Sequence, residues 1–115
     1  MRNDKENLIV DLTFKFSLTI LDFCEQLESE RKFILSRQLL KSGTSIGANV
    51  REAQNAESKA DFIHKFKIAA KEADETEYWL MLCRESPHYP DPGARLEELQ
   101  GIERIISKII SSSKA

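Results

Sequence analysis

Four blocks of apolar residues with a helical repeat constrain this fold more than any other feature of the sequence. Within each block the apolar residues recur every three or four positions, as Ile9, Leu12 and Phe16 do in the first. That spacing places them on one face of an α-helix, and no block alternates as a β-strand would. The sequence therefore predicts an all-α fold with helices over residues of about 4–27, 32–56, 58–85 and 92–111.

Local signals indicate where these helices begin and end. Asn3 and Ser58 each precede an acidic residue by three positions, which is the spacing of a capping box at a helix N-terminus. The segment 86–92, SPHYPDP, cannot be helical, because each proline disfavours helix in the residue before it. We expect Asp91 to cap the last helix and Pro92 to occupy its first position.

Short connections between the blocks set the predicted architecture. Helices joined by only a few residues run antiparallel, so we expect an up-down-up-down four-helix bundle. The chain has 115 residues, which is the size of one domain, and it shows neither an internal repeat nor a linker-like stretch. We therefore predict a single domain over residues 1–115.

Composition excludes several classes of protein. The two cysteines, Cys24 and Cys83, lie in apolar patterns without metal-binding spacing, so we expect buried small side chains rather than a disulfide framework or a zinc site. No apolar run approaches the roughly 18 residues of a membrane span, and the N-terminus lacks the pattern of a signal peptide. We therefore expect a cytoplasmic protein with no membrane partner, no metal and no cofactor.

Charge is unevenly distributed behind a net charge of −2. Residues 31–71 contain nine basic and three acidic side chains, whereas residues 1–30 and 72–103 are acidic. A basic region of this kind can bind RNA or DNA by neutralising phosphates. It can equally be a solvated face that pairs with acids of neighbouring helices, since no aromatic residues interleave with it as a stacking platform would require. The candidate nucleic-acid contacts are Arg37, Lys41, Arg51, Lys59, Lys65, Lys67 and Lys71.

The third predicted helix has a second stripe beside its core-facing one. It combines apolar residues with two carboxylates, those of Glu72 and Glu75, and it contains the single tryptophan, Trp79. Tryptophan is frequent in interface hot spots, and carboxylates in such a seam are costly unless they are paired. The stripe is therefore either a contact between protomers or a polar margin of the monomer core. Its members are Asp61, Lys65, Ile68, Glu72, Glu75, Trp79 and Leu82.

A run of small residues interrupts the second predicted helix. Gly43 and Gly47 are four positions apart, so they share a face at which a neighbouring backbone can approach closely. Ser45 and Asn49 have the same spacing, and we expect both to hydrogen-bond across a helix interface. The run lacks the GxxxxGK[ST] pattern and the preceding strand of a phosphate loop, so nucleotide binding is not expected.

No catalytic constellation emerges from the sequence. A di-iron bundle needs two ExxH motifs and two further glutamates, and only one histidine, His64, lies within a predicted helix. Glu72 and Glu75 form a possible acid/base pair, which leaves a small acid/base or metal-dependent enzyme as a remote alternative. We expect a protein that is not an enzyme and has no catalytic residues.

Residues 37–83 carry a family likeness. The motifs are the QLL run at 38–40, an SIxxN segment at 45–49, Glu52, an FxxK segment at 62–65, and KEADETEYWL at 71–80. In this combination the stretch resembles the 23S rRNA-intervening-sequence proteins, a bacterial family of four-helix bundles. A related branch is similar to the accessory protein of diversity-generating retroelements, a pentamer that binds a reverse transcriptase and nucleic acid.

The resemblance implies a ring-like homopentamer whose biochemical role is poorly defined. It places the second stripe within the family signature, with Asn49 and Arg51 as candidate polar partners of Glu72 and Glu75. We therefore expect a non-enzymatic homo-oligomer that serves as a binding or scaffold module, with RNA or a nucleic-acid-processing protein as partner. The alternative is a purely structural protein–protein oligomer that binds no nucleic acid. The candidate interface residues are Ser45, Ile46, Asn49, Glu52, Glu72, Glu75, Tyr78 and Trp79.

Overall fold

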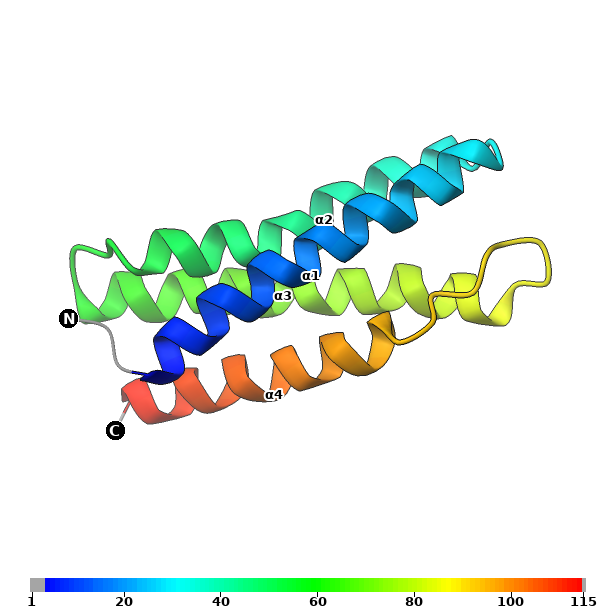
Figure 1. The fold of residues 1–115 in the computed structure, drawn as a ribbon. Coiled ribbons are helices and arrows are strands. Elements are labelled where there is room, and N and C mark those ends of the chain that lie inside the picture. The colour runs from blue at the N-terminus through cyan, green and yellow to red at the C-terminus, as the bar shows by residue number, and fades with distance from the viewer. Residues whose placement is uncertain (1–3, 115) are drawn as a thin grey trace.

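Four helices account for most of the computed structural model, which describes residues 4–114 (Figure 1). They are α1 (Asp4–Ser29), α2 (Phe33–Ala53), α3 (Lys59–Glu85) and α4 (Arg95–Lys114). No strand occurs among the described residues, so the predicted all-α class is confirmed. The predicted cap at Asn3 lies outside this range.

One apolar core lies between the helices. α2 packs against α1 and α3, while α4 packs against α3 and α1, so each helix buries the stripe that its sequence period predicts. Both ends of the described chain lie at the same end of the molecule (Figure 1). The largest core side chains, all nearly inaccessible to solvent, are Ile9, Ile20, Phe23, Leu27, Leu39, Ile46, Phe66, Leu80, Leu99 and Ile106.

The start of α3 follows its local signal. The Ser58 hydroxyl accepts a hydrogen bond from the backbone N–H of Asp61 at 3.0 Å, and the Asp61 carboxylate accepts one from the N–H of Glu57 at 3.2 Å. These bonds satisfy backbone donors that have no partner within the helix. The cap predicted at Ser58 is confirmed.

The predicted start of the last helix is wrong by three residues. The Asp91 carboxylate accepts a hydrogen bond from the Gly93 N–H at 2.8 Å, which makes a tight turn rather than a helix cap. Gly93 has a φ of 61°, a left-handed conformation that glycine adopts without strain and that a right-handed helix cannot include. α4 therefore begins only at Arg95.

Close contacts set the spacing of α2 from its two neighbours. A Cβ atom added at Gly47 would lie 3.2 Å from the carbonyl oxygen of Thr13, so the backbones of α1 and α2 approach closely there, as predicted. On the other side of α2, the hydroxyls of Ser42 and Thr76 lie 2.9 Å apart in the core and join α2 to α3. A buried hydroxyl needs such a partner, so the pair fixes how the two helices meet.

Both cysteines are buried and free, as predicted. Burial raises the pKa of the Cys83 thiol to about 11, and the nearby Cys24 adds to the rise. A thiol that stays protonated at neutral pH is a poor nucleophile and metal ligand, so these residues serve packing. Within the described chain, no helix has both the length and the apolar character that crossing a membrane requires.

Candidate functional site

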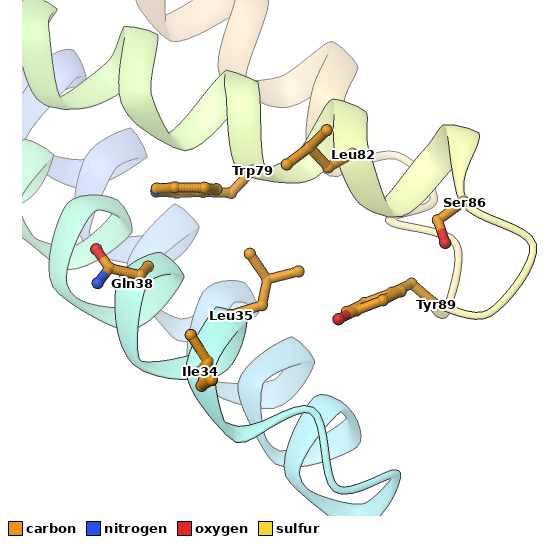
Figure 2. A pocket seen from close by; sticks show the side chains of 7 residues that line it. All are labelled: Ile34, Leu35, Gln38, Trp79, Leu82, Ser86 and Tyr89. Carbon is orange, nitrogen blue, oxygen red and sulfur yellow. The ribbon is translucent and has the colours of Figure 1, made fainter.

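An open, apolar groove lies between α2 and α3 at the end of the molecule where α2 begins (Figure 2). Its cavity has a volume of about 670 Å³. Side chains of both helices point into it, and Tyr89 closes one end from the loop between α3 and α4 (Figure 2). We call this cavity the α2/α3 groove, which is lined by Ile34, Leu35, Gln38, Trp79, Leu82, Ser86 and Tyr89.

Trp79 forms the α3 wall of the groove. Its indole Nε1–H donates a hydrogen bond to the Glu75 carboxylate at 3.2 Å, one helical turn earlier. The Tyr78 ring packs edge-on against the indole with 5.3 Å between ring centroids. The Glu75 carboxylate thus has a partner in its own helix, and it holds the indole in a fixed orientation toward the groove.

The rim of the groove exposes large apolar side chains. Ile34 is 79% exposed and Leu82 is 42% exposed. At the closed end the Lys32 ammonium lies 4.7 Å from the centroid of the Tyr89 ring, a cation–π contact that steadies the loop. An apolar hollow with an apolar rim is typical of a contact surface rather than of a solvated face.

Several predicted interface residues lie beyond the groove on the same side of the bundle. Glu52 of α2 and Lys65 of α3 form an ion pair at 3.2 Å, so these residues join two helices of one chain. Glu72 is half-buried, and its backbone carbonyl accepts a hydrogen bond from the Thr76 hydroxyl at 2.8 Å. The second stripe of α3 therefore lies partly buried alongside α2, and at Trp79 it forms part of the groove lining.

Three other predicted interface residues have different roles. Ile46 is fully buried in the core and has no surface to offer a partner. The Ser45 hydroxyl donates to the Lys41 carbonyl at 2.6 Å, and the Asn49 amide donates to the Ser45 carbonyl at 2.8 Å. The predicted hydrogen bonds across a helix interface are wrong within this chain, because short polar side chains reach the carbonyl four residues earlier.

Arg51 also lies away from its proposed partners. It lines a shallow hollow with Phe14 and Ser17 of α1 and with Thr44 of α2. Its side chain therefore faces α1, whereas Glu72 and Glu75 belong to α3. Within one chain the structure does not bring Arg51 to these carboxylates.

The basic residues are mostly on the surface. Of the seven candidate contacts, Lys65 is half-buried and the other six are exposed. Among the described residues, Lys65 is paired with Glu52, while no ion pair involves the side chains of Arg37, Lys41, Arg51, Lys67 and Lys71. Lys67, Lys71 and the exposed Tyr78 are spaced by four and seven positions along α3, so they share a face. The structure thus places one aromatic ring on the same helix face as two lysines.

An exposed apolar face on α1 was not predicted from the sequence. Phe14, Leu18 and Leu21 are spaced by four and three positions, and 54%, 47% and 45% of their surfaces are exposed. Their spacing is the signal that could have revealed this second stripe, but the stronger core stripe through Ile9 and Phe16 conceals it. We call these three residues the α1 ridge.

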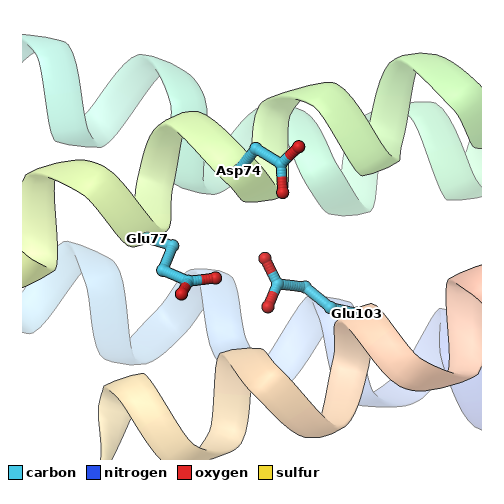
Figure 3. A group of neighbouring side chains, drawn as sticks. All are labelled: Asp74, Glu77 and Glu103. Carbon is cyan, nitrogen blue, oxygen red and sulfur yellow. The ribbon is translucent and has the colours of Figure 1, made fainter.

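Three carboxylates form a cluster that the sequence could not reveal. Asp74 and Glu77 of α3 point toward Glu103 of α4 (Figure 3). One carboxylate oxygen from each of the three residues lies within 4.8 Å of the other two. Burial raises the pKa of Glu103 to about 8, and the neighbouring carboxylates of Glu77 and Asp74 add to the rise. A shared proton relieves the repulsion between such neighbours near neutral pH.

The fold and these surfaces define a class: an all-α protein of four helices with an apolar contact groove and an exposed basic surface. The chain belongs to the 23S rRNA-intervening sequence protein family, whose model matches residues 5–112. A solved structure of a protein of unknown function from the S23 ribosomal protein family of Bacteroides thetaiotaomicron is 41% identical in sequence. It superposes with a TM-score of 0.87, over 93% of this chain and 98% of that one. Among curated proteins, none matches this chain.

Proposed function

We propose that this protein is a non-enzymatic scaffold, an up-down-up-down bundle that assembles as a homo-oligomer and binds RNA through its basic surface. A pentamer is the expected assembly. The observation that supports RNA binding is a set of exposed basic side chains of α2 and α3 that form no ion pair within the described chain, namely Arg37, Lys41, Arg51, Lys67 and Lys71. A basic face that exists only to balance acids on neighbouring helices would be paired with them.

The physical basis of RNA binding is the release of counterions from phosphates. Each phosphate neutralised by a lysine or arginine releases part of the condensed counterion layer, so affinity falls steeply as salt rises. Lys67 and Lys71 share their face with the exposed ring of Tyr78, on which an unpaired base can stack. This arrangement favours single-stranded RNA over duplexes.

The salt dependence of binding tests the proposal that the protein binds RNA. We expect a fluorescent single-stranded RNA to bind at low salt. The slope of the logarithm of the binding constant against the logarithm of the salt concentration should become shallower by about one for each phosphate contact removed. Lys67→Gln and Lys71→Gln should each flatten the slope. Lys108→Gln removes an exposed lysine from α4, outside the basic region, and should leave the slope unchanged. Absence of binding at low salt would reject the proposal that the protein binds RNA.

A purely structural protein–protein oligomer is the second candidate. The apolar rim and lining of the α2/α3 groove favour it, because they suit contact with a protein surface rather than with phosphates. Native mass measurement of the purified protein, with and without added RNA, separates the two candidates. An oligomer whose mass does not change when RNA is added would support the structural oligomer.

A further inference from the structure

We propose that the α1 ridge of one copy of this chain seats in the α2/α3 groove of the next copy, in a head-to-tail contact. This inference rests on the proposed homo-oligomer and names the two surfaces that would build it. The contact partner is thus a second copy of the same chain. Three observations support that choice.

The first observation is that the ridge and the groove are both apolar and both unpartnered. Phe14, Leu18 and Leu21 lie on one face of α1, each about half exposed, although the core stripe of the same helix is fully covered. Contiguous apolar patches on a protein surface often mark sites of protein–protein contact. Seating the ridge in the groove would remove both apolar surfaces from water at once.

The second observation is that the two surfaces have complementary shapes. A row of side chains on one helix is convex, whereas the groove is a hollow between two helices with Trp79 as its wall (Figure 2). Side-chain rows of one helix commonly fill grooves on the surface of a facing helix, and a hollow between two helices offers a row of side chains a comparable fit. Because ridge and groove are different surfaces, the contact is heterologous, and such contacts produce rings when the rotation closes.

The third observation is that the flanking charges are opposite. Asp22 and Glu25 follow the last ridge residue on α1, and both are exposed. Arg37 and Lys41 lie three and seven positions after Ile34, so they are on the same face of α2 as the groove rim. Within the described chain none of these four side chains forms an ion pair. Seating the ridge would bring acidic and basic flanks together, which favours this register.

Single charge substitutions on each surface test the contact by light scattering after size exclusion. We expect Leu18→Asp on the ridge and Ile34→Asp on the rim each to dissociate the oligomer, with at least a tenfold rise in the dissociation constant. Leu8→Asp is the matched control, because Leu8 is a leucine of the same helix with 46% exposure on a different face. It should leave the mass unchanged, and circular dichroism should show all three variants folded.

Mixing the two variants distinguishes a head-to-tail contact from a symmetric one. Leu18→Asp retains an intact groove and Ile34→Asp retains an intact ridge, so together they should form a one-to-one dimer that grows no further. Two variants that dissociate but do not pair on mixing would overturn the inference. So would an oligomer that withstands both substitutions, although it would leave the proposed homo-oligomer standing. A monomeric wild type would instead reject the oligomer itself.

Discussion

Replacing Glu103 with glutamine should remove a loss of stability that the wild-type protein suffers as pH rises. The carboxylates of Asp74, Glu77 and Glu103 meet between α3 and α4, and burial and their repulsion raise the pKa of Glu103 to about 8. In the unfolded chain the pKa of this carboxyl lies near its ordinary value of 4.5. The folded state therefore binds more protons between these values, and its stability falls as pH rises from about 4.5 to about 8.

The size of the effect follows from the shift and from the solvent around the cluster. Each pKa unit corresponds to about 1.4 kcal/mol, so the full shift sets an upper bound of about 5 kcal/mol. Glu103 is only partly buried and Asp74 is exposed, so water screens their repulsion. We therefore expect the wild type to lose about 1–2 kcal/mol across this pH range. Glutamine is neutral and nearly isosteric, so the variant should keep that free energy.

Urea unfolding followed by circular dichroism, at fixed protein concentration between pH 5 and pH 9, measures the difference. Glu103→Gln should match the wild type at pH 5 and exceed it by about 1–2 kcal/mol at pH 9. Glu97→Gln removes an exposed carboxylate from the same helix and should keep the wild-type slope. If Glu103→Gln also keeps the wild-type slope, repulsion within the cluster does not control the protonation of Glu103.

Four further substitutions probe the packing and the helix ends, each measured by urea or thermal unfolding. Gly43→Ala should destabilise by about 1–3 kcal/mol because its Cβ would lie 2.9 Å from a core side chain. Gly101→Ala should stabilise by up to about 1 kcal/mol, because its Cβ would meet only the Arg104 guanidinium, at an ordinary contact distance of 3.9 Å. Equal effects of the two substitutions would contradict the close approach at Gly43. Ser58→Ala should cost about 1 kcal/mol through the lost cap, and an unchanged midpoint would refute that role. Thr76→Val should cost about 1–3 kcal/mol by leaving the buried Ser42 hydroxyl oxygen without its interhelical donor, and a neutral result would mean that Ser42 accepts a hydrogen bond from another donor.

The candidate site was only partly predictable from the sequence. The stripe that contains Trp79 was evident from its spacing, and the structure places Trp79 in the wall of the α2/α3 groove. The tyrosine at the end of the groove, Tyr89, was not evident, because a loop residue has no periodicity to reveal its neighbours. Ser45 and Asn49 have the spacing of an interface pair, yet each bonds to a carbonyl of its own helix. Spacing shows which face a residue is on, but not which acceptor it chooses.

The sequence by itself determined the number and approximate extent of the helices and the start of α3, because helical periodicity and the cap at Ser58 depend on residues only a few positions apart. Where α4 begins is also a local matter, because Asp91 and Gly93 are two positions apart, but a helix cap and a tight turn were equally plausible there and only the tertiary structure distinguished them. It alone brought Glu103 to the carboxylates of α3 and left the α1 ridge uncovered. These features depend on which helices become neighbours, and that follows from burying all four apolar stripes together rather than from any one segment.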